Sequence, residues 1–224
     1  MSGRKQDPSS SQTGSSGSYD TRSFHNMKTG KYTFKFLNED VYSGDWLKDL
    51  PHGLGTYEMV ANRNGELWVY RQCQFLDGEP INGTLLKYTS RSTSNEYYRY
   101  QGDFEDWCEH GRGRVIDSTT TPPNTFQGLF KLGKWVEGAL TTEHGYRYEG
   151  KFDSNGMKYH DMNGKLCFPP KSNYKEFQGV LEQGRILQGE MKYRASSSRD
   201  VYIGTFKDGM HLLGLYIYIL GRVM

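Results

Sequence analysis

The sequence predicts an all-β protein, an elongated antiparallel meander of β-hairpin repeats that forms an open, curled sheet. Two features of the composition point that way. Aromatic residues make up 14% of the chain and glycines number 27, while the hydrophobic share is only 35%. This balance suits a thin structure in which large rings supply most of the buried area and glycines let backbones approach. The third observation is an internal repeat.

The clearest copy of the repeat reads YSGDW at 42–46, followed by PHGLGTY at 51–57. It recurs in the same register as YQGDF at 100–104, followed by HGRG at 110–113. In both copies the leading aromatic lies ten residues before the histidine. The signature positions of these two copies are Tyr42, Gly44, Trp46, His52, Gly53, Gly55 and Tyr57 in the first, and Tyr100, Gly102, Phe104, His110, Gly111 and Gly113 in the second.

Looser copies keep the aromatic–x–Gly–x–aromatic opening and lose the HGxG. They are Phe126, Gly128 and Phe130; Tyr148, Gly150 and Phe152; Phe177, Gly179 and Leu181; and Tyr202, Gly204 and Phe206. A degenerate copy has Arg71, Cys73 and Phe75 at the corresponding places. The seven copies start near 42, 71, 100, 126, 148, 177 and 202, so the period varies between 22 and 29 residues.

Successive residues of a strand face opposite sides, so Tyr42, Gly44 and Trp46 share one face while Ser43 and Asp45 share the other. The glycine leaves a gap over which a ring from a neighbouring strand can lie. Short turns then reverse the chain, and each copy becomes a hairpin. Seven hairpins give about fourteen strands. We expect most rings to form the core and some to line an open aromatic groove.

The motif YxGxWxxGxxHGxGxY resembles the MORN repeat (membrane occupation and recognition nexus). The copy at 42–57 has Asp49 where the family prefers glycine, and the copy at 100–115 has Trp107 there and Val115 in place of the last aromatic. The resemblance covers essentially everything outside the N-terminal tail. It implies a β-hairpin array of the kind that occurs in junctional membrane proteins, in ciliary and cytoskeletal scaffolds, and beside lipid-kinase or methyltransferase domains.

Residues 1–26 are rich in Ser and Gly without any hydrophobic period, so we predict a disordered tail, followed by a repeat array over 27–224. The net charge of +2 argues against a nucleic-acid partner. Three distant cysteines, Cys73, Cys108 and Cys167, favour neither a disulfide framework nor a zinc site. We expect a cytoplasmic protein, which could lie at the cytoskeleton or a membrane surface, because neither a signal peptide nor a membrane-length apolar run is visible.

No residue set predicts catalysis, a metal or a cofactor. His52 and His110 could be metal ligands or a pH switch, but without partners at ligand spacing we interpret them as turn histidines that bond to backbone. The run Cys108-Glu109-His110 places a nucleophile beside a base but offers no oxyanion hole. Gly111-Arg112-Gly113 is no phosphate loop, because no helix follows it.

The sequence therefore predicts a non-catalytic scaffold that docks protein partners along its aromatic groove. One alternative is a peripheral module for anionic phospholipid, using Lys31 and Lys35 with two basic residues of the tail. Another is the targeting fragment of a larger enzyme, such as a phosphatidylinositol phosphate kinase. The strand at 213–220 is apolar on both faces, which predicts a homodimer through the C-terminal edge.

Overall fold

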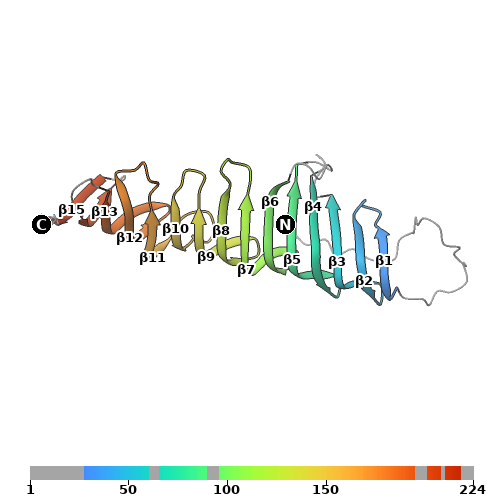
Figure 1. The fold of residues 1–224 in the computed structure, drawn as a ribbon. Coiled ribbons are helices and arrows are strands. Elements are labelled where there is room, and N and C mark those ends of the chain that lie inside the picture. Colours follow the sequence, from blue (N-terminus) through green and yellow to red (C-terminus); the bar gives the residue numbers. More distant parts are fainter. Residues whose placement is uncertain (1–27, 61–65, 90–95, 195–200, 208–209, 218–224) are drawn as a thin grey trace, which may run out of the picture. The chain divides into compact units, whose positions relative to one another are not determined.

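The computed structural model describes residues 28–60, 66–89, 96–194, 201–207 and 210–217. These residues form fifteen strands and no helix (Figure 1), which confirms the predicted all-β class. The predicted disordered tail, 1–26, lies outside the described residues. The chain divides into two compact units, Met1–Val115 and Ile116–Met224.

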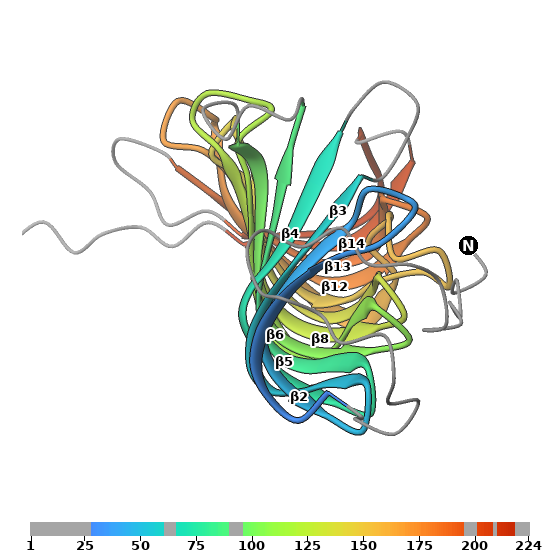
Figure 2. The same ribbon diagram turned by 90° about the vertical axis from the view of Figure 1, so that its right-hand side faces the viewer.

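In the first unit, consecutive strands are hydrogen-bonded neighbours in one antiparallel meander. Its strands are β1 (Gly30–Lys35), β2 (Val41–Leu47), β3 (Leu50–Val60), β4 (Leu67–Leu76), β5 (Glu79–Tyr88), β6 (Glu96–Glu105) and β7 (Cys108–Asp117), of which the last two residues belong to the second unit. Figure 2 shows that strands of this unit, such as β2 and β5, bend along their length. The sheet therefore has a concave and a convex face, which we call the inner and the outer face.

The second unit repeats this arrangement, again with each strand paired to the next one along the chain. Its strands are β8 (Asn124–Lys131), β9 (Lys134–Thr141), β10 (Arg147–Lys151), β11 (Asp161–Cys167), β12 (Tyr174–Glu182), β13 (Arg185–Tyr193), β14 (Val201–Lys207) and β15 (Met210–Ile217). The predicted antiparallel meander of hairpins is thus confirmed within each unit. Its strand count among the described residues exceeds the predicted fourteen by β1, which precedes the first complete copy.

The two faces of the hairpins differ as predicted, except in the β4–β5 hairpin, where Leu67, Val69, Leu86 and Tyr88 form a buried cluster on the outer face as well. In β2, Tyr42 and Trp46 are buried, whereas Ser43 and Leu47 are exposed. Within each unit the inner face carries a layer of rings, none more than 8% exposed at the opening positions of the copies. The buried rings of these openings are Tyr42, Trp46, Phe75, Tyr100, Phe104, Phe126, Phe130, Tyr148, Phe152, Phe177, Tyr202 and Phe206.

The two rings of one opening meet edge to face. Their centroids lie 5.2 Å apart in Tyr42–Trp46 and in Tyr100–Phe104, and the interplanar angles are 80° and 70°. The three later pairs with two rings have the same geometry, at 5.1 to 5.2 Å. Such a contact is worth about 0.5–1.5 kcal/mol beyond the buried area. The repeat therefore reproduces one packing unit and not merely a hydrophobic pattern.

The glycines of each hairpin make room for its leading ring. Gly44 lies directly opposite Gly55 in the sheet, and a Cβ on Gly44 would come within 2.6 Å of the Tyr42 hydroxyl. A Cβ on Gly55 would meet the same ring. The ring over the gap is therefore the leading aromatic itself, which covers the glycine of its own strand and that of the next.

The hairpin turns use a conformation with positive φ at both central residues, as in type I′ turns, which match the twist of the strands. Five of the described turns have this form: Lys48–Asp49, Asp77–Gly78, Asp106–Trp107, Leu132–Gly133 and Gln183–Gly184. Glycine is the natural residue at the second position. The two copies with a complete HGxG are the ones that have Asp49 and Trp107 there, at φ of 67° and 63°.

This turn geometry leads to a prediction for Leu132. Its φ is 48° and its side chain is 46% exposed, so little packing compensates the strained backbone. We expect Leu132→Asn, which creates the preferred Asn-Gly pair, to stabilise the protein by about 0.5–1 kcal/mol. Urea unfolding measures this, with Leu129→Asn, on the neighbouring extended strand, as control. A loss of stability in Leu132→Asn would contradict the assigned turn.

The degenerate second copy corrects one detail of the sequence interpretation. Its leading ring is Tyr70, which is fully buried, and Arg71 is exposed. Phe75 follows Tyr70 by five positions, whereas the second ring follows the first by four positions in the other openings. The extra residue forms a bulge at Gln72, whose φ is 50° and beside which the register with β5 shifts.

Beyond the bulge, Cys73 takes the place of the missing glycine opposite Gly55, where it is fully buried. The structure describes the backbone of β15 but not its side chains, and residues 218–224 lie outside the described part. The predicted homodimer through the C-terminal edge therefore stays a prediction.

Candidate interaction surface

The leading tyrosines of the repeat form a hydrogen-bond pattern inside the sheet. The Tyr42 hydroxyl donates to the carbonyl of Asp45 at 2.9 Å and is 3.3 Å from that of His52. The Tyr100 hydroxyl does the same with Asp103 and His110, at 2.7 and 2.9 Å. The HG segment is thus tied to the leading ring through its main chain, which accounts for the fixed ten-residue spacing.

The Nδ1 atoms of both histidines are buried and make no hydrogen bond to backbone among the described residues. Nδ1 of His52 is buried without a hydrogen-bond partner among the described residues. In the other copy, Nδ1 of His110 lies 2.7 Å from a carboxylate oxygen of Glu105. Within the part of the chain that the structure describes, no three His, Cys, Asp or Glu side chains gather as a metal site would require.

The glycine after each histidine has a conformational reason. Gly53 and Gly111 have φ of 62° and 61°, a region that side chains disfavour. A Cβ on Gly53 would also lie 3.1 Å from Cβ of Asp45, and one on Gly111 would lie 2.8 Å from the Asp103 carboxylate. The Asp of the opening and the Gly of the HG segment therefore belong to one structural contact. The signature residues build the fold.

The buried phenols predict a loss of stability at high pH. Burial, with a smaller contribution from Asp45, raises the pKa of Tyr42 from 10 to about 12. The pKa values of Tyr57, Tyr100 and Tyr148 are raised by burial as well. A group whose pKa is higher in the folded state stabilises fully below its unfolded pKa and loses that contribution as the pH passes its folded pKa.

We therefore expect the free energy of unfolding to hold up to about pH 10 and to fall between about pH 10 and 12. Urea titrations at several pH values would show it. Tyr42→Phe removes one titrating phenol and should fall less steeply over that window than the wild type. Equal slopes for the two proteins would contradict the buried position of this hydroxyl.

The run Cys108-Glu109-His110 does not form a nucleophile–base pair. Glu109 is 7% exposed and accepts from Lys87 Nζ at 3.3 Å and from the Tyr98 hydroxyl at 3.0 Å. Lys87 Nζ in turn lies over the rings of Trp68 and Tyr98, 4.5 and 4.2 Å from their centroids. Burial raises the pKa of Cys108, which favours the unreactive thiol.

This cluster of Trp68, Lys87, Tyr98 and Glu109 was not found by sequence reasoning. Trp68 lies opposite Lys87 and Lys87 opposite Tyr98 in the strand register, so the first three are brought together by pairing alone. Glu109 comes from β7. The alternation of the strands could have placed Lys87 on the inner face, but only the register reveals its partners.

Trp107 closes the inner face of the first unit. Its ring packs edge-on against Tyr57 at 4.8 Å and Tyr70 at 5.2 Å, and the Tyr70 hydroxyl donates to its carbonyl at 2.6 Å. A residue of the β6–β7 turn thus reaches back to β3 and β4. Together with the burial of the signature rings, this means that those rings do not line the predicted open aromatic groove.

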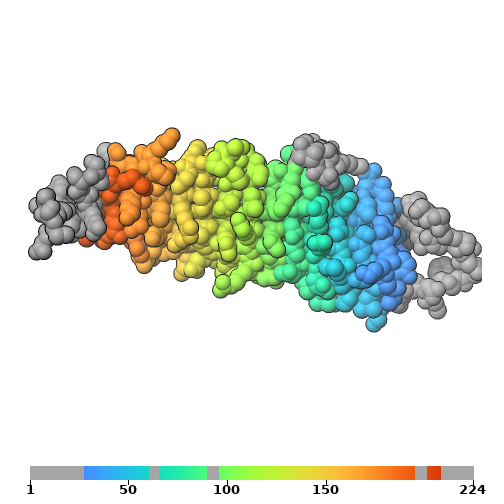
Figure 3. Space-filling view, viewed as in Figure 1, coloured from blue at the N-terminus to red at the C-terminus, as the bar shows by residue number. Residues whose placement is uncertain are grey.

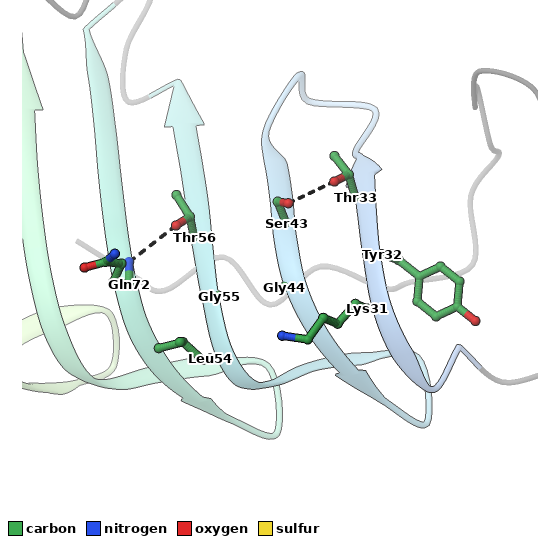
Figure 4. Close-up of a pocket in the computed structure, with 9 residues that line it drawn as sticks. All are labelled: Lys31, Tyr32, Thr33, Ser43, Gly44, Leu54, Gly55, Thr56 and Gln72. Carbon is green, nitrogen blue, oxygen red and sulfur yellow. Dashed lines mark hydrogen bonds between the residues drawn. The ribbon is translucent and has the colours of Figure 1, made fainter.

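The outer face of the first unit instead carries a shallow depression of about 390 Å³ near β1. Its lining comes from four strands: Lys31, Tyr32, Thr33, Ser43, Gly44, Leu54, Gly55, Thr56 and Gln72. Figure 4 shows the Lys31 side chain extending from β1 over β2 and Leu54 lying between β3 and β4, while Thr33 bonds to Ser43 at 2.9 Å. Leu54 is 53% exposed, an apolar point in a polar surround.

Strand β1 borders this depression and forms an edge. Among the described strands it pairs with β2 alone, and five of its six residues are exposed. The residues of β1 lie at one end of the described surface of the first unit, in blue in Figure 3. Lys28, just before β1, lies over the Phe34 ring at 3.6 Å. The edge and the depression together are the candidate interaction surface.

The described residues contain no helix that is long and apolar enough to cross a membrane. In comparisons with known proteins, no family model matches the chain, and a search of curated proteins finds no match either.

Proposed function

We propose that this protein is a non-catalytic scaffold for protein–protein interaction, built of MORN-type repeats and acting in the cytoplasm. The observation that carries this proposal is the contrast between the two faces of the repeat. The inner face is nearly the same in every copy, and its rings are buried in the core. At the opening positions the outer face differs from copy to copy and is exposed or half-buried.

The outward positions of the openings display this variety. The residue before and the residue after the opening glycine are Ser43 and Asp45, Gln101 and Asp103, Gln127 and Leu129, Glu149 and Lys151, Gln178 and Val180, and Ile203 and Thr205. A constant core that presents a changing surface is how repeat proteins bind extended partners. Both polar and apolar side chains occur at these outward positions, which suits the recognition of a partner better than catalysis.

Proteins captured from a native lysate by the full chain would test the proposal. Two outward double variants serve as matched probes, Leu54→Lys with Leu76→Lys in the first unit, and Leu129→Lys with Ile203→Lys in the second. All four side chains are 43% to 53% exposed, so both variants should fold. We expect one double variant to lose a captured protein that the wild type and the other variant retain.

Two results would contradict the scaffold. One is a captured set that neither double variant changes. The other is an empty capture accompanied by co-sedimentation of the chain with phosphatidylserine vesicles at physiological salt, which would favour the phospholipid-binding alternative.

A further inference from the structure

We propose that β1 binds an acidic, extended segment of a partner protein as an added β-strand. This inference rests on the proposed scaffold function and adds the place, the binding mode and the chemistry of the partner. Edge strands offer a row of backbone donors and acceptors on which another strand can pair. Three observations on β1 indicate that the added strand is an acidic segment of another protein.

The first observation is the exposure of Tyr32. It lies opposite Gly44, so its side chain is on the inner face, the face on which β2 buries Tyr42 and Trp46. Yet Tyr32 is 48% exposed, whereas Tyr42 and Trp46 on β2 are at most 4% exposed. Figure 4 shows its ring pointing away from the sheet, beyond the edge. A further strand beside β1 would cover this ring with an apolar side chain.

The second observation is the charge of the edge. Residues 28–38 contain three lysines, Lys28, Lys31 and Lys35, and no acidic residue. Lys31 and Lys35 are four positions apart, so both point to the outer face. The ion pair of Lys31 with Asp45 is long, at 3.5 Å, and Lys31 stays 79% exposed. Such a pair contributes little and leaves the lysine able to bind another carboxylate.

The third observation decides against two other occupants. Lysines on an edge strand oppose pairing with a second copy, because like charges would face each other. The chain's own residues 1–27 carry Arg4, Lys5 and Arg22 against Asp7 and Asp20, so they are not acidic either. An acidic strand of another protein gains from the same lysines that disfavour these two.

The alternation of β1 specifies the pattern of the partner. Lys31, Thr33 and Lys35 face outward, while Tyr32 and Phe34 face inward. An added strand should therefore place carboxylates at alternate positions on the outer side and apolar side chains between them. A peptide that alternates glutamate and valine is the simplest probe with this chemistry.

Fluorescence anisotropy of this labelled peptide with the full chain tests the proposal. We expect saturable binding that weakens with salt, and binding that is at least roughly tenfold weaker in Lys31→Glu with Lys35→Glu. The double variant should instead bind a lysine–valine peptide. The matched control, Lys131→Glu with Lys207→Glu, reverses two exposed lysines of the second unit and should bind the acidic peptide as the wild type does.

The backbone contribution is tested with two versions of the peptide, N-methylated at odd or at even positions. A strand presents alternate N–H groups to each of its edges, so only one version should bind. Hydrogen exchange should slow in residues 30–35 on binding. Equal binding of both versions, or unchanged exchange in β1, would overturn strand addition.

Other outcomes also overturn the proposal. Binding that appears only after removal of residues 1–26 would show that the chain's own segment covers the edge. A dimer in light scattering that Lys31→Glu abolishes would make a second copy the occupant. If the acidic peptide does not bind while an outward double variant still loses its captured protein, strand addition at β1 is wrong and the scaffold proposal is retained.

Discussion

Replacing Trp46 with alanine should destabilise the protein by about 3–5 kcal/mol, the usual cost of deleting a buried tryptophan. Trp46 is 4% exposed, and its indole N–H donates to the carbonyl of Tyr32 at 3.2 Å. Its ring meets Phe34 and Tyr42 edge-on, at 5.9 and 5.2 Å. The variant loses the packing of β2 and the bond that holds the edge strand.

Urea unfolding of the variant beside Asp45→Ala gives the measurement. Asp45 is the preceding residue and faces outward. It lies beside Gly53 and forms the long ion pair with Lys31, so its replacement should cost less than about 1 kcal/mol. Comparable costs for Trp46→Ala and Asp45→Ala would mean that the inner face is not the core. Since the β1 edge depends on Trp46, the Trp46→Ala variant should also exchange the amides of residues 30–35 faster.

Gly138→Ala should cost about 2 kcal/mol or more, although it adds a single methyl group. Gly138 lies opposite Gly128, and its Cβ would come within 2.7 Å of Gly128 Cα and 2.8 Å of the Phe126 ring. It would also collide with the carbonyl oxygen of Gln127. Because two of these contacts are with backbone, a side-chain rotation cannot relieve them, and the strands must separate.

Gly184 is a matched control, because a side chain there is limited by the backbone conformation and not by space. Nothing lies within 4 Å of a Cβ at Gly184, but its φ is 81°. Gly184→Ala should therefore cost about 1 kcal/mol through the backbone, and Gly184→Asn less, since asparagine tolerates this conformation. At Gly138, asparagine should be worse than alanine. The same order of the two substitutions at both sites would refute the distinction between space and backbone conformation.

The fold could be predicted because the information is local and repeated. A spacing of two between Tyr42, Gly44 and Trp46 already determines which side chains share a face, and a second copy at Tyr100 makes chance an unlikely source. Burial in β2 and β6 follows that alternation. The strand β1 was left out of the count because it has a lone glycine at its start and no complete opening.

The candidate surface could not be predicted, for reasons that lie in the register and the turns. The exposure of Tyr32 follows from β1 being an edge, which its own residues do not encode. The sequence identified Trp107 only as a residue at the repeat position where the MORN family prefers glycine. Its contact with Tyr57 depends on the curvature of the sheet. Lys87 and Glu109, 22 residues apart, meet on the inner face although β5 and β7 are not neighbours in the sheet.

The order of the strands has a consequence for folding kinetics. Within each unit every strand pairs with its neighbours in sequence, so loop closure is short and contact order is low. Such a chain can nucleate at any hairpin and grow outward, and under force it should yield strand by strand from its ends. Trp107 makes a contact of longer range, because it joins the β6–β7 turn to β3. The segment between them should therefore open as one cooperative block, seen as a single larger step in a pulling trace.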